Sequence, residues 1–165
     1  MKANSLLALA LLTTSCGTEL CTPNEPTETE NFSVGNVIVE PRSFPIAPTH
    51  IEEAISLVGK LLVEKVPAYS ADEISQALET FPLTIEYFDS LPGVLGQHIG
   101  QRIKLAYISD CPGETSLAHE LVHYFGWATG HGSDHDHIDT RLWASSNSVE
   151  GLAEASLISQ FCACP

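Results

Sequence analysis

Residues 103–128 read IKLAYISDCPGETSLAHELVHYFGWA, and this stretch decides the fold. Residues 103–108 alternate and are rich in β-forming side chains, which predicts a strand. The segment Ser109-Asp110-Cys111-Pro112-Gly113 then interrupts the pattern. From Thr115 the apolar residues recur at steps of three and four, namely Leu117, Leu121, Val122, Phe125 and Ala128. The stretch therefore predicts a strand, a turn and a helix in direct succession.

The predicted helix carries the motif His119-Glu120-Leu121-Val122-His123. On a helix this spacing places the two histidines one turn apart on one face, where both rings can bind a single zinc ion. Glu120 then lies beside the water on that metal and is expected to act as its general base. The motif is typical of metalloproteases, and the alternative is an amphipathic helix that carries two histidines without a metal.

The motif and its surroundings resemble the zincin metallopeptidases over residues 83 to 154. A Gly-rich stretch at residues 92–100 precedes the strand, where zincins have a β-hairpin whose edge strand lines the substrate cleft. The resemblance implies Zn²⁺ as the cofactor and a peptide or protein as the substrate. It does not extend to the metzincins, because Thr129 occupies the position of their third histidine although Gly126 matches their glycine.

The third metal ligand is predicted in the loop that follows the helix, after Gly130 as a C-terminal cap. A zinc hydrolase needs three protein ligands and one open position for water. We predict His137, because the packing residues that follow it can anchor the returning loop: Ile138, Leu142 and Trp143. His135 is the next candidate, and His131 has a Gly-His-Gly setting loosely similar to the His-Gly ligand of SprT-type proteins. The alternative for the whole loop is a solvated polar segment.

Glu150 offers a competing completion of the site. Glu150-Gly151-Leu152-Ala153 resembles the Glu-Gly-x-Ala segment of gluzincins, which implies Glu150 as the third zinc ligand. Asn147 and Glu150 also have the spacing of a capping box, in which Glu150 would reach back to the start of a helix. Both interpretations of Glu150 stay open at this point.

The N-terminus has the pattern of an export signal. Lys2 is followed by the short apolar run Leu6–Leu12, which is too short to span a bilayer as a stable helix. Residues 13–16, Thr-Thr-Ser-Cys, resemble a bacterial lipobox, which implies cleavage before Cys16 and acylation of that residue. We therefore expect a signal peptide over residues 1–15 and a lipoprotein held at the outer membrane or cell surface. A secreted or periplasmic protein is the alternative.

Four cysteines remain if Cys16 carries lipid, which predicts two disulfides in an oxidising compartment. Cys162 and Cys164 are too close for a comfortable mutual bridge. We expect one of them to pair with Cys111 and the other with Cys21.

Residues 16–31 form a predicted tether, rich in Thr, Pro and Glu, and residues 32–165 form one domain. Within the domain, capping boxes predict helices that begin at Thr49 and at Ser70, the second ended by Pro82. Strands are predicted at 37–39 and 83–87, and a closing helix from about Ser148. The predicted fold is α+β, a minimal zincin-like domain with helices packed on one face of a small antiparallel or mixed sheet.

The chain has 7 Lys and Arg residues against 21 Asp and Glu residues, a formal net charge of −14. Phosphate contacts need clustered basic residues, so nucleic acid is excluded as an expected partner.

The predicted function is a zinc metallopeptidase with His119, His123 and His137 as ligands and Glu120 as the base that activates water. A donor to the developing oxyanion is also needed, and Tyr124 or a loop histidine is expected to supply it. The alternatives are a non-catalytic metal-binding lipoprotein and a degenerate zincin kept as an interaction module.

Overall fold

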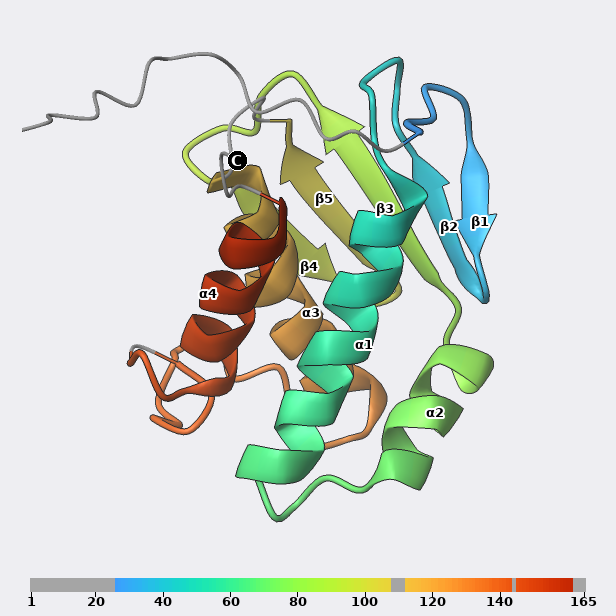
Figure 1. Cartoon of the computed structure of the whole chain (residues 1–165). Coiled ribbons are helices and arrows are strands. Elements are labelled where there is room, and N and C mark those ends of the chain that lie inside the picture. The colour runs from blue at the N-terminus through green and yellow to red at the C-terminus, as the bar shows by residue number, and fades with distance from the viewer. Residues whose placement is uncertain (1–25, 108–111, 144, 162–165) are drawn as a thin grey trace, which may run out of the picture.

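The structure is a computed structural model that describes residues 26–107, 112–143 and 145–161, without the side chains of 112–115 and 161. Five strands and four helices lie in this part of the chain (Figure 1). In chain order they are β1 (Phe32–Val34), β2 (Val37–Glu40), α1 (Pro48–Lys65), α2 (Ala71–Thr80), β3 (Leu83–Phe88), β4 (Gly96–Ile99), β5 (Arg102–Ala106), α3 (Pro112–Ala128) and α4 (Val149–Phe161). The predicted α+β class is confirmed.

The strands form one mixed sheet in the order β1-β2-β3-β5-β4. The three central strands are parallel, and β1 and β4 pair antiparallel at the two edges. Helices α1 and α2 make the long connection that parallel β2 and β3 require, whereas a tight turn at Gly100 joins β4 to β5. The edge strand β4 lies next to α3, which carries the histidine motif.

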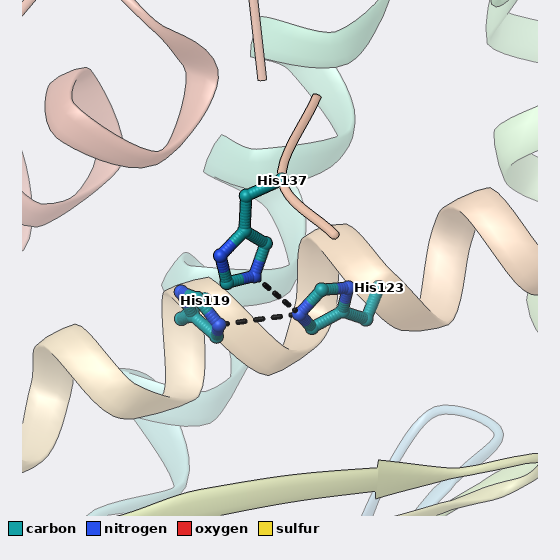
Figure 2. A group of neighbouring side chains, drawn as sticks. All are labelled: His119, His123 and His137. Carbon is teal, nitrogen blue, oxygen red and sulfur yellow. Dashed lines mark hydrogen bonds between the residues drawn. The ribbon is translucent and has the colours of Figure 1, made fainter. Parts of the chain in front are cut away.

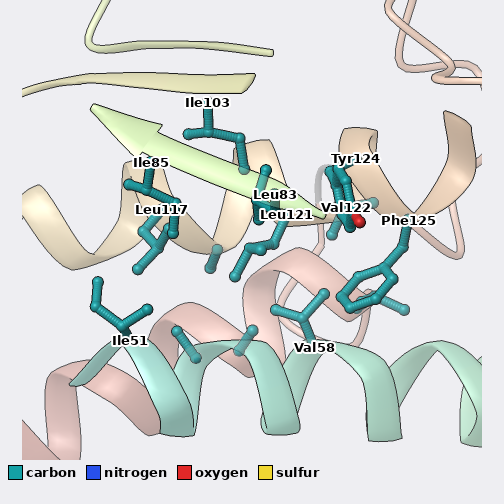
Figure 3. Close-up of a cluster of buried hydrophobic side chains, with 14 of the residues drawn as sticks. Ile51, Val58, Leu83, Ile85, Ile103, Leu117, Leu121, Val122, Tyr124 and Phe125 are labelled. Atoms are coloured by element: carbon teal, nitrogen blue, oxygen red, sulfur yellow. The ribbon is translucent and has the colours of Figure 1, made fainter. Parts of the chain in front are cut away.

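The core lies between the sheet and the helices α1 and α3 on one of its faces, with α2 and α4 packed against these two helices (Figure 1). Alternate residues of the central strands point into this core, as strand geometry requires. They are Val37, Val39, Leu83, Ile85, Ile103 and Leu105, each 2% exposed or less. Figure 3 shows Leu83, Ile85 and Ile103 facing apolar side chains of α1 and α3. The apolar face of α3 therefore points into this core, and His119 and His123 lie on a different face of the helix.

The start of α1 differs from the sequence prediction. The helix begins at Pro48 with Ala47 as N-cap, and no side chain caps it. The predicted capping box at Thr49 is therefore wrong. Proline at the first helical position has no N–H to satisfy and already holds a helical φ, so the N-cap is Ala47, two residues before Thr49.

Helix α2 begins as predicted. The Ser70 hydroxyl accepts from the Glu73 N–H at 3.3 Å, and the Glu73 carboxylate accepts from the Ser70 N–H at 2.9 Å. The helix stops before Pro82, with Phe81 as its C-cap. This capping box is confirmed.

The strand predicted at residues 103–108 is β5, which ends at Ala106, and α3 begins at Pro112, before the expected Thr115. Gly130 follows the end of α3 with a φ of +80°, in agreement with its predicted role as the cap. The short edge strand β1 was not predicted.

Cys16, Cys21, Cys111, Cys162 and Cys164 lie outside the described residues, as do the signal peptide and the acylation site. At the end of the predicted tether, Glu28 pairs through its backbone with Ile46. Among the described helices, none is long and apolar enough to cross a membrane.

Candidate metal centre

Three histidines meet at one point between α3 and the loop that follows it (Figure 2). His119 and His123 come from successive turns of α3, and His137 comes from the loop. Their potential ligand atoms all lie within 4.8 Å of one another. This group can hold a metal ion, and its members are the three residues predicted from the sequence.

The spacing of the ring nitrogens fits a small tetrahedral ion. Nε2 of His123 lies 3.1 Å from Nε2 of His119 and 3.3 Å from Nε2 of His137. Two nitrogens bound to one tetrahedral zinc at 2.0–2.1 Å would lie about 3.3 Å apart. Both distances from His123 are close to this value, and the potential ligand atoms of all three histidines lie within 4.8 Å of one another.

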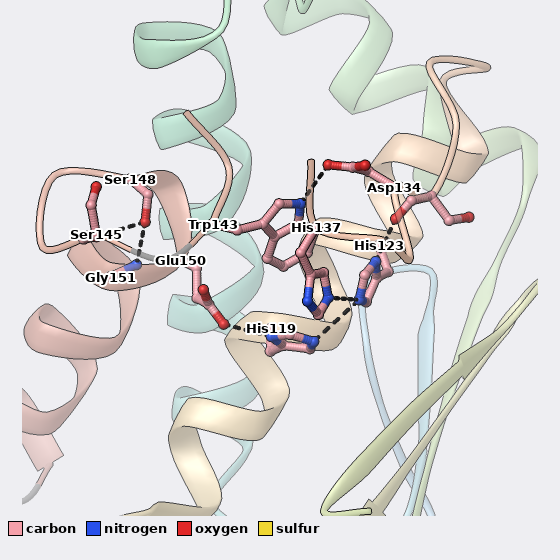
Figure 4. Close-up of polar contacts among 10 residues, drawn as sticks. His119, His123, Asp134, His137, Trp143, Ser145, Ser148, Glu150 and Gly151 are labelled. Atoms are coloured by element: carbon pink, nitrogen blue, oxygen red, sulfur yellow. Dashed lines mark hydrogen bonds and ion pairs between the residues drawn. The ribbon is translucent and has the colours of Figure 1, made fainter. Parts of the chain in front are cut away.

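The other nitrogen of His119 is held by a carboxylate. Nδ1 of His119 lies 2.5 Å from Oε1 of Glu150, near the start of α4 (Figure 4). Burial opposes the charged form of His119, but the bond to Glu150 and the nearby Glu120 and Glu154 outweigh it and raise the pKa of His119. An Nδ1–H that donates to Glu150 leaves the Nε2 lone pair directed at the metal position, an arrangement common among zinc-binding histidines.

The second motif histidine is held by the backbone. Nδ1 of His123 donates to the carbonyl oxygen of Ser133 in the loop. Burial lowers the pKa of His123 to about 4, more than the Ser133 bond raises it, and the neighbouring histidines lower it further. His123 is therefore neutral at physiological pH, which is the form that binds metals.

The loop that carries His137 is organised by the carboxylate of Asp134. This carboxylate accepts from the N–H groups of Ile138 at 3.2 Å and Asp139 at 3.0 Å and from Nε1 of Trp143 at 2.7 Å. The backbone N–H of His137 also donates to the Asp134 carbonyl at 2.9 Å. These bonds close a turn from which the His137 ring reaches toward α3.

Trp143 packs against all three ligand candidates. Its ring centroid lies 4.9 Å from that of His119 and 4.5 Å from those of His123 and His137. Trp143 is 1% exposed and Leu142 is 6% exposed, so both anchor the loop as predicted. Ile138 does not, because 75% of it is exposed.

A close approach between the loop and α3 depends on Gly126. The N–H of Gly132 donates to the Gly126 carbonyl at 2.9 Å, and a Cβ on Gly126 would lie only 2.3 Å from the Gly132 oxygen. A larger residue at position 126 would push the loop away from the helix. The loop could not then return to the histidine face along the same path.

Glu120 is buried against the edge strand β4, and its carboxylate acts electrostatically on His119. Its carboxylate fills the place where a Cβ of Gly96 would lie, at 2.6 Å from Oε1, and it also accepts from the backbone N–H of His98. Burial raises the pKa of Glu120 to about 7, although His119 and the His98 bond act in the opposite direction. A carboxylate with a pKa near neutrality can both accept and release a proton.

The other loop histidines lie outside the ligand group. His135 is exposed, and its ring lies beside that of His123, with centroids 4.7 Å apart. His131 packs edge-on against Tyr69 at 4.5 Å, and its Nε2 lies 3.7 Å from Glu73. Neither joins His119 and His123 in the metal-binding group.

The structure rules out one candidate oxyanion donor and one candidate helix cap in this region. The hydroxyl of Tyr124 donates to the carbonyl of Phe81 at 2.5 Å inside the core, so it does not face the metal position. The cap of α4 is Ser148 and not Asn147, because the Ser148 hydroxyl accepts from the N–H of Gly151 at 3.1 Å, and Glu150 contacts His119.

Three contacts that organise the site were not predicted from the sequence. They are the Asp134 carboxylate, the Ser133 carbonyl and the contact of Glu150 with His119. Asp before a turn is a recognisable signal, because its side chain often accepts from backbone N–H groups just ahead in the chain. The other two depend on tertiary packing and have no local signal.

Comparison of the chain with protein-family models, with curated proteins and with solved structures found no match.

Proposed function

We propose that the protein is a zinc-dependent metallopeptidase. The observation that carries the proposal is the convergence of the Nε2 atoms of His119, His123 and His137, together with the buried carboxylate of Glu120, which acts electrostatically on His119. Three nitrogen ligands with one position left for water are characteristic of catalytic zinc sites. A site that only stores metal has no need of a protonatable carboxylate at this place.

The chemistry follows from the residues around the metal position. Zinc, when bound, supplies Lewis-acid chemistry by acidifying water and polarising a carbonyl oxygen. Glu120 takes a proton from the attacking water and then passes it to the leaving amine nitrogen, as general base and general acid in turn. Glu150 and Ser133 keep His119 and His123 in the orientation that binds the ion.

The edge strand supports a peptide as the substrate. Among the described residues, β4 pairs only with β5, so the outer side of its backbone can pair with an extended chain except at the His98 N–H, which donates to Glu120. Gly96 and His98 of this strand contact Glu120. Leu95 and Ile99 beside them are 53% and 52% exposed, which offers apolar surface to substrate side chains.

The experiment is a comparison of zinc content and hydrolysis of a denatured protein substrate in wild type, Glu120→Gln and His119→Ala. Wild type should hold near-stoichiometric zinc and cleave the substrate, and Glu120→Gln should keep the zinc and lose the cleavage. His119→Ala should lose both. Glu154→Gln is the matched control, because it removes another carboxylate whose charge acts on His119.

If wild type binds zinc but Glu120→Gln leaves its cleavage unchanged, the peptidase proposal is wrong. A protein that binds zinc tightly and cleaves nothing would favour the non-catalytic metal-binding protein instead.

We further propose that the protein is exported and anchored through an acylated Cys16. The support is the N-terminal sequence alone, since these residues lie outside the described part of the chain. Cys16→Ser should leave the protein unprocessed or released from the membrane fraction. A normally processed chain that stays in the membrane would contradict the proposal.

A further inference from the structure

The hydrolysis proposed above requires a hydrogen-bond donor besides the metal. When water adds to a peptide carbonyl, negative charge builds on the carbonyl oxygen, and a prepositioned donor stabilises that charge. From the sequence, the candidates for this donor are Tyr124 and the loop histidines. The hydrogen bonds of the described residues now separate these candidates.

Most of the neighbouring donors are already in use. Tyr124 donates to Phe81, Nε1 of Trp143 donates to Asp134, and Nε2 of His98 donates to the carbonyl of Gly100 at 2.7 Å. Their N–H and O–H groups point at protein acceptors. None of the three can turn to a substrate without breaking that bond.

The three loop histidines differ in whether they already have another role. His137 belongs to the ligand group, and His131 lies against Tyr69 and near Glu73. Of the two described loop histidines outside the ligand group, His131 and His135, only the exposed His135 contacts the ring of a ligand candidate. In the described part of the chain, its imidazole makes no hydrogen bond, so its N–H is available to a ligand.

The position of His135 is set by the same turn that places His137. The N–H of His137 donates to the Asp134 carbonyl, which closes the turn Asp134–His137 with His135 inside it. The His135 ring lies beside the rings of two neighbours, with centroids 4.7 Å from His123 and 6.1 Å from His98. It therefore borders the metal position on the side where the edge strand β4 runs.

We propose that His135 is a catalytic residue that donates a hydrogen bond to the carbonyl oxygen of the scissile peptide bond as negative charge develops on it. This inference rests on the proposed metallopeptidase function. It assigns different roles to two histidines only two residues apart: His137 binds the metal and His135 binds the substrate.

The test uses the zinc-loaded protein and three measurements: zinc affinity, cleavage of denatured casein, and binding of a peptidyl phosphinate. The phosphinate has a tetrahedral anionic centre and so reports on transition-state stabilisation without turnover. His135→Ala should keep its zinc affinity within about threefold, because no metal ligand is removed. Its kcat and its phosphinate affinity should each fall by roughly 10²–10³, the usual effect of losing one such donor.

Two variants sharpen the comparison. His135→Gln should recover part of both losses, because its amide N–H can donate where an alanine cannot. His131→Ala is the matched control, a loop histidine away from the ligand group, and should behave as wild type.

The outcomes distinguish this inference from the proposed function. If wild type cleaves casein and His135→Ala equals it in cleavage and phosphinate binding, His135 is not the donor and the peptidase proposal stands. If His135→Ala loses zinc instead, His135 is a ligand and the inference is wrong. If zinc-loaded wild type neither cleaves casein nor binds the phosphinate, the proposed function fails and this inference fails with it.

Discussion

Nδ1 of His119 and Oε1 of Glu150 lie 2.5 Å apart, although 31 positions separate the two residues in the chain. The contact joins the middle of α3 to the first turn of α4, two helices that pack against each other. Glu150 thus acts on the metal position through His119 and is not itself in the ligand group. This contact favours a third role for Glu150 over the two that the sequence suggested, metal ligand and helix cap.

Removal of the Glu150 side chain should weaken metal binding without abolishing it. In Glu150→Ala, His119 loses the acceptor that fixes its tautomer, and zinc affinity should fall about 10- to 100-fold. Ser148→Ala is the control at the same helix end: it removes the cap and should cost about 1 kcal/mol of stability while zinc affinity is unchanged. Competition titration with a chromophoric chelator measures the affinities, and equal affinity of Glu150→Ala and wild type would contradict the assigned role.

Loss of His137 should have a larger effect than loss of Glu150. His137→Ala removes one of three ligand nitrogens, so zinc affinity should fall by more than the ~100-fold limit that loss of an outer-sphere partner produces. The same titration ranks the two variants. A larger loss of zinc affinity in Glu150→Ala than in His137→Ala would show that Glu150, and not His137, is the third ligand.

Local signals in the sequence predicted most of the fold. The alternation of β3 and β5 and the Ser70 capping box are short-range patterns, and each produced the expected element. The start of α1 was misplaced because the capping pattern at Thr49 competed with Pro48, and proline at the first position prevailed. Strand β1 has three residues, too few for a periodic pattern to be recognised.

The site could be predicted where its geometry is local. The spacing of His119 and His123 needs only a helix, and the choice of His137 needed only a loop that returns. The residues that hold these ligands could not be found in the same way. Glu150 reaches His119 only because α4 packs on α3, and Ser133 reaches His123 only because Gly126 allows the loop to lie close to the helix.

Asp134 should be required both for stability and for metal binding. Asp134→Asn keeps a residue that tolerates the φ of +44° at this position but removes the charge and one acceptor oxygen. At least one of its three donors then loses a partner, which should cost about 1–3 kcal/mol in the free energy of unfolding. Zinc affinity should also fall, because the turn that presents His137 is loosened. Asp136→Asn, at an exposed position in the same loop, should change neither the urea midpoint nor the affinity.

The raised pKa of Glu120 predicts a pH-dependent stability in the metal-free protein. Burial raises this pKa from an ordinary value of 4.5 to about 7, so between these values the folded state binds more protons than the unfolded state. Stability contributed by Glu120 must then fall as pH rises from about 4.5 to 7, by about 3 kcal/mol at about 1.36 kcal/mol per pKa unit. Glu120→Gln removes this ionisation.

In the presence of a chelator, wild type and Glu120→Gln should therefore be about equally stable near pH 4, and the variant should be more stable by about 3 kcal/mol near pH 8. His123 acts in the opposite direction, since its pKa is lowered to about 4, but it is common to both proteins and cancels in their difference. Urea unfolding at a series of pH values measures that difference. Saturating zinc should reduce it, because a cation beside Glu120 favours the carboxylate. A difference that stays constant with pH would show that Glu120 is not held in a buried environment that opposes its charge.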